Sequence, residues 1–191
     1  MYHGRVKVVL SYLLAVGGLG LMIYVITAVV AINLTYPGAR LAMLNALRTS
    51  VSHADYLCRS VPGTFFEAIG AAIKLGYMAG TTDIAVIQQT TAPGYDATIT
   101  MITLKWKSLF GHAKKAVMLA IGGVALAISV HAMPVVHIIL AVFVLGAAIW
   151  VFIAKMDTER SILRARAELL PELNRAFAEG RVQPPAAAAA R

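Results

Sequence analysis

Two histidines and a serine interrupt the longest apolar run of this chain. The run covers residues 116–154, and within it the stretch Ser129–His137 reads SVHAMPVVH. An imidazole changes its charge near about pH 6.5, and it also binds metals and haem. We therefore regard Ser129, His131 and His137 as candidate residues of an ion pore or of its mouth. Hydration at a membrane surface and ligation of haem or a metal are the alternatives for the two histidines.

The rest of the sequence shows no pattern of catalytic or metal-binding residues. It has no nucleophile beside a base, no phosphate-binding glycine loop and no cluster of metal ligands. Glu67 and Lys74 are typical of a solvated helix face. The single cysteine, Cys58, cannot form a disulfide within the chain and is typical of a small core residue. We expect neither an enzyme nor a bound cofactor or metal.

The composition points to a membrane. The chain has 191 residues, of which 59% are hydrophobic and 14% charged, whereas a soluble domain carries about 25% charged residues. So small a chain has no interior that could bury this much apolar surface. The net charge of +8 could indicate nucleic-acid binding, but in a membrane protein an excess of basic residues normally reflects how the chain is oriented in the bilayer. We expect an integral membrane protein whose first partner is the lipid bilayer, with no nucleic-acid partner.

The first apolar segment, residues 8–33, contains no charged residue. It is longer than the roughly 7 to 15 apolar residues of a signal peptide, so we expect a retained transmembrane helix. Residues 116–154 as one helix would measure about 58 Å, against about 30 Å for the hydrocarbon core. Because Pro134 cannot donate a hydrogen bond inside a helix, it favours a turn here. The sequence therefore predicts spans at 113–131 and 135–154, joined by a turn at 132–134.

The basic residues divide unevenly among the segments outside these spans. Residues 34–115 contain eight lysines and arginines and residues 155–191 contain seven, whereas residues 1–7 contain two and the turn none. Cytoplasmic segments carry the excess of basic residues. We expect residues 1–7 and the turn outside the cell, and the helical region 34–112 and the C-terminal segment in the cytoplasm.

The cytoplasmic region carries helical patterns. Residues 40–58 repeat apolar side chains at helical spacing and predict one helix. Thr64 and Glu67 form a capping-box pattern that begins a second helix. Residues 81–91 predict a third, shorter helix, whose end is marked by Pro93 and Gly94.

Two apolar stripes predict helices that extend from the second and third spans. The stripe before the second span consists of Tyr95, Ile99, Ile102, Trp106, Leu109, Ala113 and Ala116. The stripe after the third span consists of Ile162, Leu169, Leu173 and Phe177. Packing within the chain and contacts between subunits are the alternatives for these faces. We expect a C-terminal helix at 155–180, with a possible bend at Pro171, and a disordered tail at 181–191.

Small residues in the spans are candidates for close helix packing. We predict that five glycines allow neighbouring helices to approach closely: Gly17, Gly18, Gly20, Gly122 and Gly123. The fold class is thus an all-α integral membrane protein with three transmembrane helices, a helical cytoplasmic insert, and long helices extending from the second and third spans.

This layout resembles the three-span TolQ and ExbB branch of the MotA/TolQ/ExbB family. The local pattern HADYLCRSVPGTFFEAIGAAIKLG, residues 53–76, is similar to the family's helix ending in Ala and Cys before Pro-Gly. The resemblance implies a homopentamer in a bacterial inner membrane, with a pore lined by the second and third spans. It also implies a single-span partner of the ExbD, TolR or MotB type, whose carboxylate would couple proton flow to mechanical work.

The spans also depart from the family pattern. Gly122 and Gly123 match a Gly-rich stretch of the family's second span, but no Thr follows them. The third span contains no Ser, Thr or carboxylate. Two functions therefore remain open. One is a motor or proton-channel subunit whose pore polarity comes from Ser129, His131, His137 and the partner, and the other is a non-conducting membrane scaffold. A haem-binding anchor is a third alternative.

Overall fold

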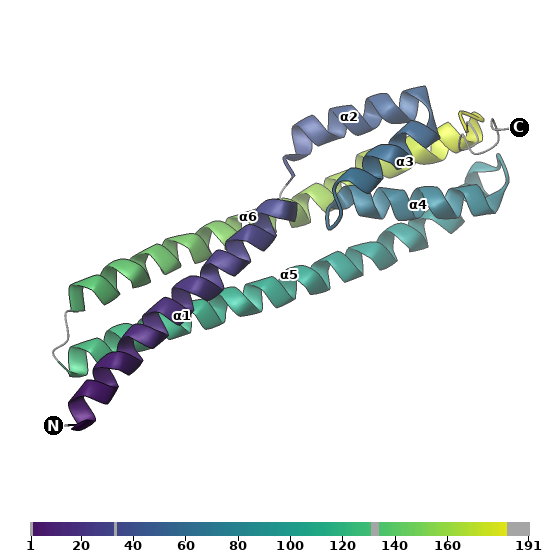
Figure 1. Cartoon of the computed structure of the whole chain (residues 1–191). Helices are drawn as coiled ribbons and strands as arrows, with labels where there is room; N and C mark the ends of the chain where they lie inside the picture. Colours follow the sequence, from purple (N-terminus) through teal and green to yellow (C-terminus); the bar gives the residue numbers. More distant parts are fainter. Residues whose placement is uncertain (1, 33, 131–133, 183–191) are drawn as a thin grey trace, which may run out of the picture. The chain divides into compact units, whose positions relative to one another are not determined.

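The computed structural model describes residues 2–32, 34–130 and 134–182. Within these ranges the regular structure is α-helical throughout (Figure 1). The helices are α1 (Tyr2–Ile32), α2 (Tyr36–Thr49), α3 (Val51–Ser60), α4 (Phe65–Ala79), α5 (Ile84–Ser129) and α6 (Pro134–Ala178). His131, most of the expected turn at 132–134 and residues 183–191 of the expected tail lie outside the described residues.

The chain divides into two compact units. The apolar unit comprises Met1–Ala31 and Lys105–Met156, and the polar unit comprises Ile32–Leu104 and Asp157–Arg191. Helices α5 and α6 each contribute residues to both units. The two units are described separately below.

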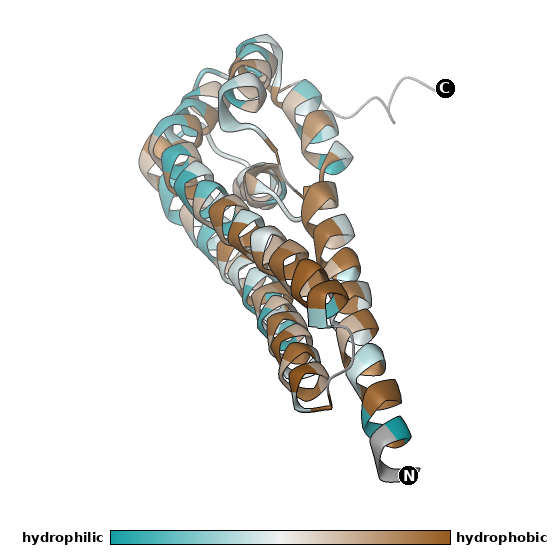
Figure 2. Cartoon of the chain, turned by 90° about the vertical axis from the view of Figure 1, so that its left-hand side faces the viewer, coloured by the Kyte–Doolittle hydropathy of each residue, from teal (hydrophilic) through white to brown (hydrophobic). Residues whose placement is uncertain are grey.

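In the part of the chain that the structure describes, three helices are long and apolar enough to cross a membrane. They are the helix that begins the chain, α5 and α6. Hydrophobic residues dominate their stretches in the apolar unit, as Figure 2 shows by the brown colouring. The structure therefore supports the expected all-helical membrane protein with three apolar helices.

All three helices of the apolar unit contact one another. The ring of Tyr12 on α1 lies against His137 on α6. The rings of Phe110 on α5 and Phe152 on α6 have centroids 6.0 Å apart. Gly18 brings α1 against α5. The apolar unit is thus a packed three-helix bundle.

The prediction of one helix over residues 40–58 was wrong, because the chain breaks at Ser50. This residue is extended, with φ −166° and ψ 149°, and separates α2 from α3. Its side-chain oxygen accepts a hydrogen bond from the backbone N–H of His53 over 3.2 Å. A serine stabilises a helix start in this way, so the local hydrogen bond outweighs the continuous apolar pattern.

The predicted start of the next helix is confirmed. Thr64 is the N-cap of α4, and its hydroxyl oxygen accepts from the N–H of Phe66 over 3.2 Å. The carboxylate of Glu67 accepts a 2.6 Å hydrogen bond from the N–H of Gly63, which has a φ of +82°. The acidic side chain therefore reaches back one residue further than in a standard capping box.

The predicted helix end at Pro93 and Gly94 was also wrong. Helix α5 begins at Ile84 and continues through Pro93. Its start is stabilised by Asp83, whose carboxylate accepts from the N–H of Ala85 over 2.9 Å. A proline inside a helix removes one hydrogen bond, here to the carbonyl of Gln89. Pro93 and Gln89 are exposed, so water can bind that carbonyl, and the helix persists.

The predicted stripes of α5 and α6 are packing faces within the chain. The buried members are Tyr95, Ile102, Trp106, Leu109, Ala113, Ala116, Ile162, Leu169, Leu173 and Phe177. In the polar unit, the hydroxyl of Thr91 donates to Oδ1 of Asn174 over 2.8 Å, and that of Tyr95 donates to the carbonyl of Ile162 over 2.8 Å. These contacts confirm the intramolecular alternative for both stripes.

The end of α6 follows the prediction. The helix passes through Pro171 and ends at Ala178, and Gly180 follows with a φ of +68°. Arg181, the first residue of the expected tail, accepts a hydrogen bond at its carbonyl from the N–H of Val51 over 3.2 Å. The chain is therefore attached to α3 up to this residue.

Candidate functional site

The candidate pore residues have contrasting surroundings. Ser129, the last residue of α5, is exposed, and its hydroxyl donates to the carbonyl of Leu126 over 2.7 Å. His137, in the second turn of α6, is only 1% exposed. His131 lies outside the described residues. The structure therefore gives Ser129 a bond to its own helix and encloses His137 within the apolar unit.

The enclosure of His137 comes from α1. The ring of Tyr12 lies 4.5 Å from the imidazole, centroid to centroid, at an angle of 50°. Tyr12 itself remains 37% exposed. Tyrosines are frequent near membrane surfaces, where one end of the ring is apolar and the other hydrated. The sequence analysis did not single out Tyr12, although its place near the start of the first span was a usable signal.

Two of the five candidate glycines lie at the contact between α1 and α5. A Cβ on Gly18 would stand 2.8 Å from the carbonyl oxygen of Ala116, and one on Gly123 would stand 3.0 Å from that of Ser11. At Gly18 this distance is too short for a larger residue, whereas at Gly123 a larger residue requires the neighbouring backbone to move by a few tenths of an ångström.

The other three candidate glycines have more room. A Cβ on Gly122 would only touch Leu14, at 4.0 Å. At Gly17 and Gly20 it would meet nothing within 4 Å. These two positions are open on the surface of α1, so they are free to face lipid or another helix.

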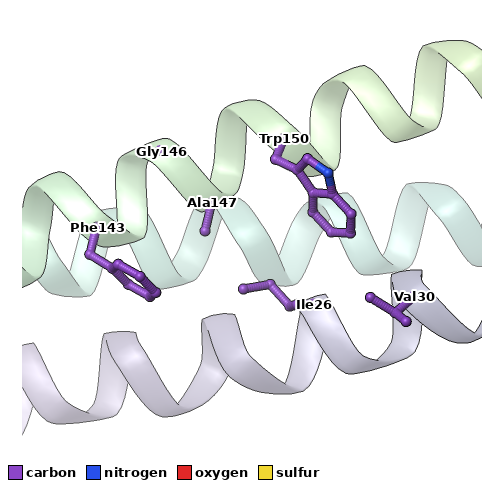
Figure 3. A pocket seen from close by; sticks show the side chains of 6 residues that line it. All are labelled: Ile26, Val30, Phe143, Gly146, Ala147 and Trp150. Carbon is purple, nitrogen blue, oxygen red and sulfur yellow. The ribbon is translucent and has the colours of Figure 1, made fainter.

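An apolar groove runs between α1 and α6 (Figure 3). Its volume is about 400 Å³. Its α6 wall repeats at helical spacing, with Gly146 and Ala147 between the larger Phe143 and Trp150, and Ile26 contributes to the α1 side. Small residues between two aromatic rings form a notch that fits the surface of a helix or an acyl chain. The spacing of these large and small residues can be read in the sequence, where residues 143–150 are FVLGAAIW.

A second groove lies between α5 and α6 on the apolar unit. It has a volume of about 460 Å³ and is lined mainly by apolar side chains, among them Val117, Ile149 and Phe152. Lys114 stands at its edge, with Nζ 5.0 Å from the centroid of the Phe110 ring. A lysine beside an aromatic face at the end of an apolar stretch is typical of a membrane surface.

Two observations concern metal binding and the reactivity of the single cysteine. Among the residues that the structure describes, no three His, Cys, Asp or Glu side chains are grouped so that they could hold a metal ion. Cys58 is 5% exposed, and burial, with a smaller effect of the Asp55 carboxylate, raises the pKa of its thiol to about 12. A thiol of this kind is protonated and unreactive at neutral pH.

No protein-family model, no curated protein and no solved structure matches this chain. The candidate site is described by its own geometry: apolar helices in close contact, open apolar grooves between them, and an enclosed histidine.

Proposed function

We propose that this chain is a subunit of a homopentameric, ion-driven motor or proton-channel complex of the TolQ/ExbB type in a bacterial inner membrane. In this proposal a single-span partner of the ExbD, TolR or MotB type occupies the pore and converts ion flow into mechanical work. The observation that carries it is the length and division of α5 and α6. They have 46 and 45 residues, and in each an apolar stretch continues into a polar one without a break.

The lengths exceed what a membrane requires. A helix of 46 residues is about 69 Å long, roughly twice the hydrocarbon thickness of about 30 Å. In the polar unit, α5 and α6 are joined by the buried hydrogen bonds Thr91–Asn174 and Tyr95–Ile162. Helices joined in this way move together, which suits a subunit that transmits motion between the membrane and the cytoplasm.

The outer surface of the apolar unit supports assembly. Large apolar side chains point outward on several sides of α6, including Val142 at 64% and Ile153 at 52% exposure. Lipid covers part of such a surface in any membrane protein. The grooves between α1 and α6 and between α5 and α6 are concave apolar surfaces into which a helix of a neighbouring subunit can pack.

A non-conducting scaffold is the second candidate function, and one observation favours it. Between residues 116 and 154 there is no Asp, Glu, Lys or Arg, although ion paths in membranes normally contain such residues. The hydroxyl of Ser129 bonds its own helix, and His137 is enclosed by Tyr12. In the motor proposal the partner's carboxylate and the assembled pore supply the missing polarity.

The mass of the complex separates these functions. The full-length protein is extracted in a mild detergent and weighed intact, and its co-purifying proteins are identified. The motor proposal expects five copies together with a single-span protein that has an Asp or Glu within its span, and proton flux when the complex is placed in liposomes. A monomer, or a closed ring without a partner and without flux, would overturn it and favour the scaffold.

A further inference from the structure

A second kind of pocket, polar and basic, lies in the polar unit. It has a volume of about 320 Å³ and is formed between the start of α2 and the adjoining part of α6. Thr35 and Tyr36 line it from α2, and Asp157, Arg160 and Arg164 line it from α6. Charged side chains form a larger part of its lining than in the grooves of the apolar unit.

Among the described residues, neither Arg160 nor Arg164 takes part in an ion pair. The nearby carboxylate of Glu168 is bound by Arg40 instead. Asp157 offsets one positive charge, so the two arginines leave the pocket with a net charge of +1 at neutral pH.

The start of α2 adds to the positive potential. Its N-cap Thr35 makes no side-chain capping bond, and its first turn contains no acidic residue. Pro37 in this turn has no N–H, so the remaining N–H groups and the helix dipole are what attracts anions at this end. Tyr36 is 7% exposed and lines the same pocket, and its ring packs against Phe65 while its hydroxyl lies near the carboxylate of Glu168.

The place of the pocket in the sequence identifies the source of the anion. Thr35 and Tyr36 follow directly on the apolar segment 8–33. Arg160 and Arg164 lie six and ten residues beyond Ala154, which is about 9 Å and about 15 Å along a helix, and the polar layer of a bilayer is about 5 to 8 Å thick on each side. Arginine side chains reach back toward the membrane over several ångströms. Both walls of the pocket are therefore close to the level of lipid phosphates.

We propose that this pocket binds the headgroup of an anionic phospholipid. Arg160 and Arg164 bind the phosphate oxygens, and guanidinium groups suit this because their N–H donors match phosphate geometry. The start of α2 faces the remaining oxygens. The bound lipid links α2 to α6 at the membrane surface. This inference does not depend on the number of subunits or on ion conduction.

The test uses the full-length protein in a mild detergent, with thermal unfolding as the readout. Phosphatidylglycerol, phosphatidylcholine and inorganic phosphate are added separately. The wild type is compared with Arg160→Gln/Arg164→Gln and with the control Arg48→Gln/Lys74→Gln. The control removes the same charge from exposed positions of the polar unit outside the pocket.

We expect phosphatidylglycerol to raise the unfolding temperature of the wild type and of the control, while the other two additions do not. Arg160→Gln/Arg164→Gln should need on the order of tenfold more phosphatidylglycerol for the same shift. An equal response of this variant and the wild type would overturn the proposal. An equal effect of inorganic phosphate would overturn the lipid as the source. If the double variant cannot be purified, Arg160→Gln alone is measured. A weaker response to phosphatidylglycerol than that of the wild type supports the proposal, and an equal response overturns it.

Discussion

The hydroxyl of Tyr95 on α5 donates a hydrogen bond to the carbonyl oxygen of Ile162 on α6, 2.8 Å away. Tyr95 is fully buried, and its ring belongs to the packing stripe of α5. Because the bond joins two segments that are far apart in the sequence, it fixes the pairing of α5 and α6 in the polar unit.

Replacing this tyrosine by phenylalanine tests how much the bond contributes. Tyr95→Phe keeps the ring and removes only the hydroxyl, so we expect the free energy of unfolding to fall by about 1 kcal/mol. Chemical unfolding of the purified protein in detergent measures the change. Tyr56→Phe is the matched control, since Tyr56 is 72% exposed and should lose almost nothing. Equal effects of the two substitutions would contradict the role of Tyr95.

The buried pair Thr91–Asn174 should behave as a coupled unit. Their side chains are 0% and 4% exposed and are joined by a 2.8 Å hydrogen bond. Thr91→Val or Asn174→Leu alone leaves one buried polar group without its partner, at a cost of about 1–3 kcal/mol. The double variant should cost less than the sum of the two single changes. Unfolding measurements on all four proteins test this, and strictly additive losses would show that the pair is not coupled.

The contact of α1 with α5 predicts different effects for two adjacent glycines. Gly18→Ala would bring a methyl group to 2.8 Å from the carbonyl oxygen of Ala116, whereas Gly17→Ala would meet nothing within 4 Å. We expect Gly18→Ala to destabilise the protein by about 1–3 kcal/mol, since the helices would have to separate. Gly17→Ala should be neutral or slightly stabilising. Thermal unfolding in detergent distinguishes them, and a harmless Gly18→Ala would disprove the close approach.

The burial of the Cys58 thiol should make the stability of the protein depend on pH in the alkaline range. Burial raises the pKa of its thiol from 9.0 to about 12. Above about pH 9 the unfolded chain loses this proton while the folded chain keeps it, so stability falls as the pH rises. The loss approaches about 1.4 kcal/mol per pH unit until the thiol ionises in the folded state as well.

Cys58→Ala removes this contribution and provides the comparison. We expect the difference in the free energy of unfolding between wild type and variant to be constant below about pH 8 and to shift against the wild type above about pH 9. Other groups titrate in both proteins and cancel in the difference. Parallel pH profiles would show that the thiol is not enclosed.

Much of the fold was predictable because its signals are local. A run of apolar residues, or a repeat of them at helical spacing, is present in the sequence itself, and the stripes from Tyr95 and from Ile162 are buried as predicted. The helix start at Thr64 was also correct, since a capping residue acts on its immediate neighbours.

The errors arose where two local rules compete. At Ser50 a capping hydrogen bond outweighed an uninterrupted apolar pattern, and at Pro93 the exposed position of the proline allowed α5 to continue. Neither outcome follows from residue type alone, because it depends on which groups the rest of the fold leaves open to water.

The parts of the site that join distant segments were not predictable. Tyr12 lies against His137, and Thr35 shares a pocket with Arg164, although more than a hundred residues separate each pair. No spacing rule connects such positions, so only the packing of the helices brings them together.

The central claim is that α5 and α6 return to the same side of the membrane, with the polar unit in the cytoplasm. The most direct test uses single cysteines in a Cys58→Ala background, placed at the exposed positions Ser129, Lys74 and Arg175, and a maleimide that cannot cross membranes. When the maleimide is added outside cells whose membrane is intact, we predict labelling at Ser129→Cys only. Lys74→Cys and Arg175→Cys should be labelled only after the membrane is permeabilised. Labelling of Lys74→Cys or Arg175→Cys in sealed cells, with Ser129→Cys protected, would contradict the account.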